Sequence, residues 1–274
     1  MEEKFDPFLA EWISFTKSDQ YNLVEKCLKM AQILEYPELD INSYVQKINE
    51  IGKALKVSVT EVKNPTYLIS MLNEVLFDNF GYQADEEDYY NPKNNFLNAV
   101  IDKKSGIPIT LSILYVEVAK HIGLELKIVG FPSHVVVKYN EEMILDPFYG
   151  GRLLEITDLQ EILDRNFGEG VEFEPNFLDE ITTEMILIRL ARNLKNSYAQ
   201  SYAYEKSLRC TNMVLALEKN SPEDIRDKGI LEERMLNSDV ALKYLNQYLE
   251  MNPNGEDVDF ILELIKSIKD KSSQ

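Results

Sequence analysis

One continuous stretch decides the fold: GIPITLSILYVEVAKHIG at residues 106–123, followed directly by LELKIVGFPSHVVVKYNEEMILDPFYGG at residues 124–151. The first part predicts a helix, because apolar residues recur along it at helical spacing. Pro108 suits the first helical turn, where its missing N–H costs nothing. Gly123 suits the C-terminal cap, which often requires a left-handed backbone. We therefore expect one strongly apolar helix at the centre of the fold.

The second part of this stretch predicts a small antiparallel sheet. Its β-branched and aromatic residues stand between turn residues, which is the pattern of short strands. The expected strands are residues 126–129, 134–139 and 143–146. Only three residues separate the last two strands, so they should pair as a hairpin. The glycine-rich turn at 147–151 is expected to end the sheet.

His134 and Asp146 occupy matching places on this hairpin, since one opens a strand and the other closes the next. A three-residue loop at 139–141 would pair the two residues and place their side chains on one face. A two-residue loop would shift the register by one residue and send them to opposite faces. The sequence alone leaves both arrangements open.

The order of these elements is that of a thiol acyl-transfer enzyme. In such enzymes a cysteine at a helix N-terminus is activated by the helix dipole and by a histidine, and its thiolate attacks an amide carbonyl. The histidine opens a strand, and an aspartate on the next strand holds the imidazole in the useful tautomer. Pro108, His134 and Asp146 stand at the corresponding places of this chain.

Several stretches together resemble the transglutaminase-like core of the bacterial SirB-type family. They are NPKNNFLN at 91–98, GIPITLS at 106–112, GFPSH at 130–134 and LDPFYGG at 145–151, with YPELD at 36–40 upstream. The helical repeats after residue 184 also fit this family. The resemblance implies a transglutaminase-like domain joined to tetratricopeptide repeats, with a poorly defined role. Some members of the family are described as transcriptional or virulence regulators.

The chain departs from active transglutaminases at the nucleophile. In those enzymes the cysteine follows a Gly-x pair, and a second glycine closes the helix 15 residues later. Counting back from Gly123 reaches Pro108, which has no nucleophilic group. His134 and Asp146 carry over by position as base and orienting acid, whereas Cys27 and Cys210 belong to other helices. We therefore expect a residual dyad without acyl transfer.

The predicted fold class is α+β and mostly helical: a papain-like core with a small antiparallel sheet, followed by a helical repeat array. Residues 1–180 should form a helical lobe with the transglutaminase-like domain, whose core spans about 66–160, and residues 181–274 the repeats. Helical patterns occupy residues 5–60 and 66–79, and we expect the first of these segments to pack onto the core, because no linker-like stretch follows it.

A period of 34 residues supports the repeat assignment. It aligns Arg192 with Arg226 and Ser207 with Ala241, and the second block keeps the spacing of a tetratricopeptide repeat through Gly229, Ala241, Leu245 and Pro253. The small residues allow two helices to approach closely, and the proline ends the second helix. The first block is degenerate, with Lys195 and Ser207 at the small positions; ordinary helical hairpins are the alternative.

Composition limits the classes of partner. Asp and Glu outnumber Lys and Arg by 47 to 29, so a net charge of -18 repels nucleic acid and anionic membranes. Two cysteines in 274 residues indicate a reducing compartment, and residues 1–12 lack the features of a signal peptide. We predict a cytoplasmic protein with a protein or peptide partner, no direct nucleic acid, no membrane, and no cofactor or metal.

Each of the other side chains that could take part in chemistry also has an ordinary structural explanation. Hydroxyl side chains near the helix start and near His134 are possible substitute nucleophiles, but such residues usually cap backbone donors. These are Ser105, Thr110, Ser112 and Ser133. The acidic run at 85–88 contains the oxygen ligands of a hard cation, yet it lacks the spacing and glycine of a calcium loop. His121 suits the end of a helix, where the dipole favours positive charge.

Three functions are compatible with these observations. The first is a non-catalytic interaction or regulatory module in which Pro108 fills the cysteine position. The second is a hydrolase of amide or ester bonds that uses His134 and Asp146 to activate water or a hydroxyl. The third is a transcriptional regulator that acts through protein contacts, as the family resemblance suggests.

Overall fold

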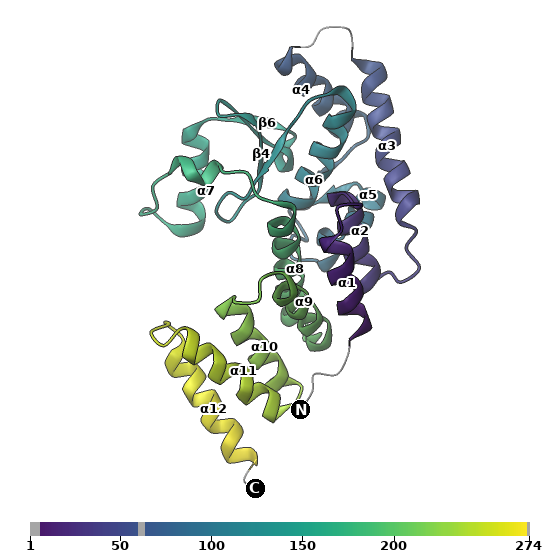
Figure 1. Ribbon diagram of the computed structural model, residues 1–274. Coiled ribbons are helices and arrows are strands. Elements are labelled where there is room, and N and C mark those ends of the chain that lie inside the picture. Colours follow the sequence, from purple (N-terminus) through teal and green to yellow (C-terminus); the bar gives the residue numbers. More distant parts are fainter. Residues whose placement is uncertain (1–5, 60–63, 273–274) are drawn as a thin grey trace. The chain divides into compact units, whose positions relative to one another are not determined.

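The computed structural model describes residues 6–59 and 64–272, and the chain divides into two compact units (Figure 1). One unit comprises residues 18–187. The other combines the described residues up to 17 with residues from 188 onwards. The two ends of the predicted helical segment 5–60 lie outside the described residues, as do the chain termini. Each unit is described by itself below.

The first unit is built around helix α6 (Pro108–Ala119), which is apolar and buried on nearly all sides. A helix of that kind belongs inside a core. Helices α2, α3 and α5 pack against it, so the predicted packing of the N-terminal segment onto the core is confirmed for α2 and α3. The bounds are α2 Leu23–Leu34, α3 Ile41–Ser58, α4 Pro65–Asn73, a π-helix Glu74–Asn79 and α5 Leu97–Lys103.

Short elements connect these helices. A 3-10 turn, η2 (Pro92–Asn95), precedes α5, and a two-residue parallel pair joins β1 (Gln83–Ala84) to β2 (Ser105–Gly106). A second 3-10 turn, η3 (Lys120–Ile122), follows α6. The predicted helix end is confirmed, because Gly123 caps this turn with a φ of 69°.

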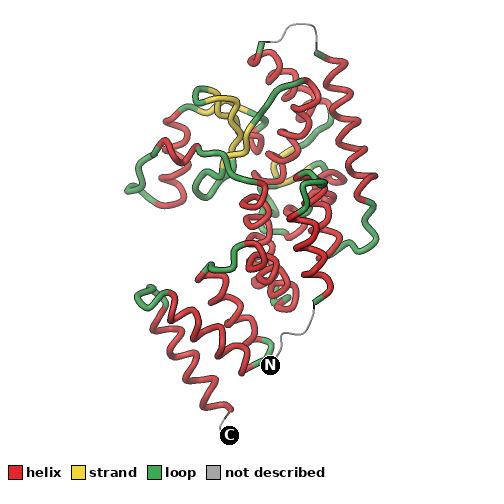
Figure 2. The backbone as a smooth tube through the Cα atoms, in the orientation of Figure 1, coloured by secondary structure: helices red, strands yellow, loops and turns green. Residues whose placement is uncertain are grey.

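The sheet has four antiparallel strands in the order β3-β4-β5-β6, visible as the main yellow region of Figure 2. Their bounds are β3 Lys127–Val129, β4 Val136–Asn140, β5 Met143–Asp146 and β6 Arg152–Leu154. The first three correspond to predicted strands. The expectation that the sheet ends at 147–151 is wrong: a 3-10 turn, η4 (Pro147–Tyr149), leads into β6, which pairs with β5.

The sheet is covered on both faces. Val136, Ile144 and Leu154 join a buried cluster with helix α7 (Ile156–Phe167) on one side. Residues on the opposite face, such as Val137 and Leu145, are also buried, and α6 packs against β3 and β4. The alternation of these strands therefore separates two apolar layers. A last 3-10 turn, Pro175–Leu178, precedes the long helix α8 (Thr183–Gln200).

The second unit is helical throughout its described residues. Helix α8 is followed by α9 Tyr204–Leu217, α10 Pro222–Arg234, α11 Ser238–Met251 and α12 Val258–Ser272. Gly229 in α10 lies so close to α11 that a Cβ there would be 2.7 Å from the Leu245 side chain. This close approach is the packing reason for the predicted small position.

In the degenerate first block, polar contacts replace the close packing of small residues. Lys195 takes the position that corresponds to Gly229, and its ammonium is buried against Asp224 at 2.8 Å. Ser207 donates to the Lys195 carbonyl oxygen at 2.9 Å, so a polar pair replaces the small-residue contact. Arg192 and Arg226, which are 34 residues apart, make similar ion pairs: Arg192 binds Asp224 (2.7 Å) and Arg226 binds Asp257 (2.7 Å).

The first helix belongs to this second unit. Helix α1 (Pro7–Lys17) packs against α9, where the fully buried Trp12 donates its indole N–H to the Met213 carbonyl oxygen at 3.1 Å. The predicted division 1–180 and 181–274 places this helix with the transglutaminase-like domain instead. A buried tryptophan explains the difference, because its large apolar ring gains most where it is fully covered. The boundary near residue 180 stays a prediction.

Candidate functional site

Helix α6 begins at the position predicted for a nucleophile. Pro108 is buried in its first turn, and the backbone of Ile107 before it is extended. Thr110 anchors this helix start: its hydroxyl donates to the Asn94 carbonyl oxygen at 2.9 Å and accepts from the Ile107 N–H at 3.2 Å. The start of α6 is thus held against η2 by a buried threonine, which explains its hydroxyl without catalysis.

His134 and Asp146 are hydrogen-bonded. The His134 Nε2 atom lies 3.0 Å from Asp146 Oδ2, within ordinary hydrogen-bond reach. The Asp146 side chain has no exposed surface, whereas the His134 side chain retains 12%. The other carboxylate oxygen, Oδ1, accepts from the backbone N–H of Phe148 at 3.0 Å. The aspartate therefore has a fixed orientation, and it fixes the imidazole in turn.

A β-bulge brings the pair onto one face. The turn of the hairpin has two residues, Glu141 and Glu142, because Asn140 pairs with Met143. That turn alone would place the two side chains on opposite faces. The register then shifts between Lys138 and Asn140, so Tyr139 is an extra residue on β4. The shift restores the arrangement in which the side chains meet, and neither of the two simple loops is present.

The turn before His134 is also unusual. Ser133 is exposed and has a φ of 60°, a left-handed conformation that non-glycine residues rarely adopt. His134 then donates its backbone N–H to the Phe131 carbonyl oxygen at 3.0 Å. This tight turn lies immediately before β4 and aims the imidazole toward the end of β5.

A cluster of aromatic rings adjoins His134 through Phe148. The Phe148 ring stands edge-on to the His134 ring, with the centroids 6.1 Å apart. Tyr89 and Tyr149 make edge contacts with the same phenylalanine at 6.1 and 5.0 Å. The turn η4, which carries Phe148, packs against α6. The helix that begins with Pro108 and the hairpin that carries the pair therefore lie against each other.

Neither cysteine fits the role of the missing nucleophile. Cys27 and Cys210 are buried in α2 and α9, with 3% and 0% of their surface exposed. Burial raises the pKa of Cys27 and that of Cys210 to about 12. Thiol enzymes need a lowered pKa, so both groups are protonated at neutral pH and poorly reactive.

The hydroxyl candidates are scattered. Thr110 is occupied by the helix start, and Ser133 is exposed at the strained turn. Ser105 lies in the short strand β2. Ser112 is completely buried in α6, and its hydroxyl has no hydrogen-bond partner among the described residues.

The acidic loop has a structural explanation. Asp85 pairs with Lys103 at 2.7 Å and accepts from the backbone N–H of Asp88 at 3.1 Å. The bond from Lys103 lowers the pKa of Asp85. Over residues 6–59 and 64–272, no group of three or more His, Cys, Asp or Glu side chains is arranged to hold a metal. His121 packs on α3 beside Gly52.

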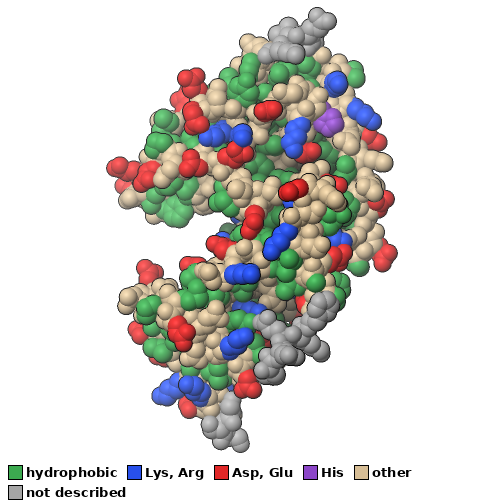
Figure 3. Space-filling view, in the orientation of Figure 1, with side chains coloured by type: hydrophobic (Ala, Val, Ile, Leu, Met, Phe, Trp, Pro, Cys, Tyr) green, Lys and Arg blue, Asp and Glu red, His purple; other side chains and the backbone are tan. Residues whose placement is uncertain are grey.

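The charged side chains and the helices bear on contacts with nucleic acid and with membranes. Acidic and basic side chains are interspersed on the face shown in Figure 3. None of the helices in the described part of the chain has both the length and the apolar character needed to cross a bilayer.

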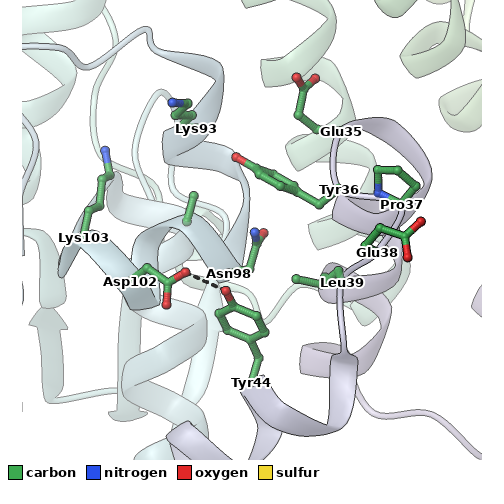
Figure 4. Close-up of a pocket in the computed structure, with 11 residues that line it drawn as sticks. Glu35, Tyr36, Pro37, Glu38, Leu39, Tyr44, Lys93, Asn98, Asp102 and Lys103 are labelled. Carbon is green, nitrogen blue, oxygen red and sulfur yellow. Dashed lines mark hydrogen bonds between the residues drawn. The ribbon is translucent and has the colours of Figure 1, made fainter.

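Sequence reasoning missed a separate pocket of about 800 Å³ (Figure 4). The turn between α2 and α3 forms one wall, with Tyr36 and Leu39, and η2 and α5 form the other, with Lys93 and Asn98. His134, Asp146 and Pro108 do not line it. The segments 36–40 and 91–98 meet at this pocket, and both belong to the family resemblance described above. Their membership in one family pattern was the feature of the sequence that could have indicated a shared site.

Comparisons with known proteins agree with this architecture. The family described as the transglutaminase-like superfamily matches residues 42–192, and a tetratricopeptide repeat family matches residues 194–266. A UPF0162 protein of Xylella fastidiosa (strain 9a5c) is 31% identical, over 83% of each chain. A UPF0162 protein of Vibrio cholerae is 23% identical over 91% of this chain and 92% of its own.

One relative is a much longer protein, and the match covers only a part of it. F-box only protein 21 of Mus musculus is 33% identical over 119 residues, which is 39% of this chain but 19% of that protein. No solved structure matched the chain. The resemblance drawn from the sequence, a transglutaminase-like core followed by tetratricopeptide repeats, is confirmed by the two family matches.

Proposed function

Because this chain belongs to the transglutaminase-like superfamily, carries tetratricopeptide repeats and is similar to UPF0162 proteins, we propose that it is a non-catalytic protein-interaction or regulatory module. The observation that carries the proposal is Pro108 in the first turn of α6. Acyl transfer requires a thiolate or an activated hydroxyl at that place, and proline offers neither.

Two further observations support this function. Burial keeps both thiols of the chain protonated, so neither replaces the missing nucleophile. The repeats supply a second part of the chain whose architecture is commonly used to bind peptides or partner helices. In this proposal the hairpin with His134 and Asp146 is a preserved scaffold and not a catalytic site.

A hydrolase is the second candidate, and one observation favours it. The 3.0 Å bond between His134 and Asp146 is the base-orienter half of a catalytic triad. Water or a nearby hydroxyl would then be the nucleophile. The residual activity of such a site is far below that of a complete triad, because nucleophile and base act as a unit.

The test compares wild type with His134→Ala in two assays: amine incorporation into a glutamine-containing protein, and hydrolysis of an activated ester. The proposal predicts no difference between the two proteins in either assay. Wild-type turnover that falls about tenfold or more in His134→Ala would establish the hydrolase instead.

A binding experiment tests the interaction role directly. The full chain, immobilised, should capture a specific partner from a lysate of the source cell, which an unrelated protein of similar negative charge does not. The absence of any specific partner in repeated captures would argue strongly against the proposal.

A further inference from the structure

The four-stranded sheet is covered at one edge and open at the other. At the β3 edge, Val129 forms a bridge with Glu180, and the Ile181 N–H donates to the Ile128 carbonyl oxygen at 3.0 Å. Strand β6 lies at the other end of the strand order, and no further strand pairs with it in the described part of the chain. Its outward-facing backbone N–H and C=O groups can therefore pair with an added strand.

One row of side chains across the sheet changes from buried to exposed at β6. Val137 of β4, Leu145 of β5 and Leu153 of β6 lie opposite one another in the strand register. The first two are 0% and 1% exposed, whereas Leu153 is 56% exposed. A side chain on an added strand would lie beside Leu153 and cover it, which is favourable because apolar surface leaves water.

A pocket of about 610 Å³ adjoins this row. Strands β5 and β6 line it with Met143, Leu145 and Leu153, and helix α4 lines it with Ile69. These apolar side chains give the pocket an apolar floor next to the open edge. Its volume lies in the range of ordinary ligand sites.

Asn73 holds the two walls of the pocket together. Its Nδ2 atom donates to the Gly151 carbonyl oxygen at 3.0 Å, and its Oδ1 atom accepts from the Tyr115 hydroxyl at 2.6 Å. Gly151 has a φ of 72°, and a Cβ there would be 2.1 Å from the Asn73 side chain. The turn before β6 therefore lies directly on α4, and fixed walls reduce the ordering that binding requires.

Two acidic side chains give the pocket a negative rim. Glu74 and Asp78 both line it, are exposed and belong to the π-helix that follows α4. Neither makes an ion pair with any of residues 6–59 and 64–272. Arg152, which also lines the pocket, is paired with Asp158 at 3.4 Å. Two unpaired carboxylates in a chain of net charge -18 favour a cationic ligand.

We propose that β6 and this pocket bind an extended peptide segment of a partner protein, in which Lys or Arg stands two residues from an apolar side chain. The segment adds a fifth strand to β6, which is a recurring mode of peptide recognition. The apolar side chain covers Leu153. Alternate side chains of a strand share a face, so the basic side chain reaches Glu74 and Asp78. This assignment names a partner class for the interaction role proposed above, and it rests on that role.

The test is an NMR titration of the full ¹⁵N-labelled chain with an acetylated heptapeptide amide, Thr-Lys-Val-Leu-Val-Lys-Thr. A dissociation constant on the order of 0.1 mM is expected for a short peptide. The isomer Thr-Val-Lys-Leu-Lys-Val-Thr has the same composition and charge, but its leucine and lysines lie on opposite faces of a strand. It should bind about fivefold or more weakly. Equal affinities would show attraction by net charge alone and would overturn the proposal.

A charge reversal tests the acidic rim. Glu74→Lys/Asp78→Lys should weaken the lysine peptide about tenfold or more and strengthen binding of Thr-Glu-Val-Leu-Val-Glu-Thr. The matched control is Glu86→Lys/Glu87→Lys, which changes the net charge equally at exposed positions outside the pocket. All four side chains are exposed, so the melting temperatures should stay close to that of wild type. Equal effects of the two double variants on binding would contradict the site.

The apolar contact is tested by Leu153→Ser. It should weaken the lysine peptide about fivefold or more, because the leucine of the peptide loses its apolar neighbour. Val57→Ser is the control, since Val57 is 87% exposed on α3 and does not line the pocket. Unchanged affinity in Leu153→Ser would remove this contact from the proposal and overturn the predicted register.

N-methylation of the peptide tests the backbone pairing. Alternate N–H groups of a strand point to the same edge, so methyl groups on the leucine and both lysines block one edge, and methyl groups on the two valines block the other. Only one of these peptides should lose its binding. Equal affinities of the two methylated peptides would overturn the fifth strand.

Failure of this site is distinguishable from failure of the interaction role. Partner capture from a lysate does not depend on the designed peptides. A chain that captures a specific partner equally well as wild type and as Glu74→Lys/Asp78→Lys, and that binds none of the peptides, would overturn the edge site and leave the interaction role in place.

Discussion

Two carboxylates in different units, Asp146 and Asp224, are both completely buried, yet their surroundings differ. Asp224 meets two cations, Lys195 at 2.8 Å and Arg192 at 2.7 Å, and accepts from the Ser221 hydroxyl at 2.8 Å. Asp146 meets one imidazole at 3.0 Å and one backbone N–H.

The difference distinguishes a carboxylate that stabilises the fold, Asp224, from one that orients a side chain of the candidate site, Asp146. Two permanent cations compensate Asp224, and they tie α8 to α10 within the repeats. The partner of Asp146 is charged only when protonated. A lone carboxylate of this kind gives little cohesion, but it holds an imidazole in one orientation. The following predictions test this contrast, from the largest expected effect to the smallest.

The largest effect is expected for Asp224→Ala. The substitution leaves Lys195, whose side chain is only 8% exposed, without one of its carboxylates. Removing one partner of a buried ion pair typically costs about 3–5 kcal/mol. The measurement is urea unfolding of the full chain followed by circular dichroism. Glu250→Ala, at an exposed position of α11, should change stability by less than about 0.5 kcal/mol. A cost below about 1 kcal/mol for Asp224→Ala would remove its scaffold role.

Lowering the pH should also destabilise the chain through Asp224. Burial alone would raise the pKa of Asp224, but the bonds from Lys195 and Arg192 outweigh it and hold the pKa below its ordinary value. A carboxylate with a depressed folded-state pKa contributes stability above its unfolded pKa of about 3.9 and loses it as pH falls through the folded value. Wild type should therefore lose more unfolding free energy than Asp224→Asn between pH 5 and pH 2. Equal losses would contradict the compensation.

Asp146→Ala should cost less than Asp224→Ala. It removes the acceptor of the Phe148 N–H and of His134, and an unsatisfied buried donor costs about 1–3 kcal/mol. Asp146→Asn keeps the volume and serves as the control, with a smaller loss. If Asp146→Ala destabilises the chain as much as Asp224→Ala does, the two carboxylates have the same role and the contrast fails.

The smallest effects concern backbone strain in the two regions. Leu236, 86% exposed after α10, has a φ of 63°, so Leu236→Gly should raise stability by up to about 1 kcal/mol. Ser133→Gly relieves a φ of 60° beside His134, and we expect a change below about 1 kcal/mol. Unfolding curves of both variants decide the matter. A loss above about 1 kcal/mol for Ser133→Gly would show that its side chain, not its backbone, supports the turn.

Much of the fold follows from the sequence because its signals are local. Pro108 and Gly123 mark the ends of the central helix, and the structure places both there. The strands β3 to β5 lie close to their predicted positions. Strand β6 escaped notice, because Arg152 and Leu153 are both exposed and give no alternating pattern.

The geometry of the candidate site and of the pocket depends on features that the pattern of apolar residues in the sequence does not show. The meeting of His134 and Asp146 requires the extra residue Tyr139, and a bulge leaves no clear trace in the order of apolar residues. The pocket joins Tyr36 to Asn98, which are far apart in the chain and meet only because the α2–α3 turn packs beside α5. Each motif alone predicts a turn or a short helix.

The most direct test of the central claim, a transglutaminase-like core that lacks only its nucleophile, is the alkylation rate of Pro108→Cys against pH. Wild type is the blank, because its two thiols are buried. An ordinary thiol, with a pKa of about 8.5, is almost wholly protonated at pH 6. Position 108 is buried, so the pH midpoint of the rate, and not its absolute size, reports the thiol. The account predicts a midpoint at least about one pH unit below that of a free thiol, with the shift lost in Pro108→Cys/His134→Ala. A rate with the ordinary pH dependence, unchanged by His134→Ala, would contradict it.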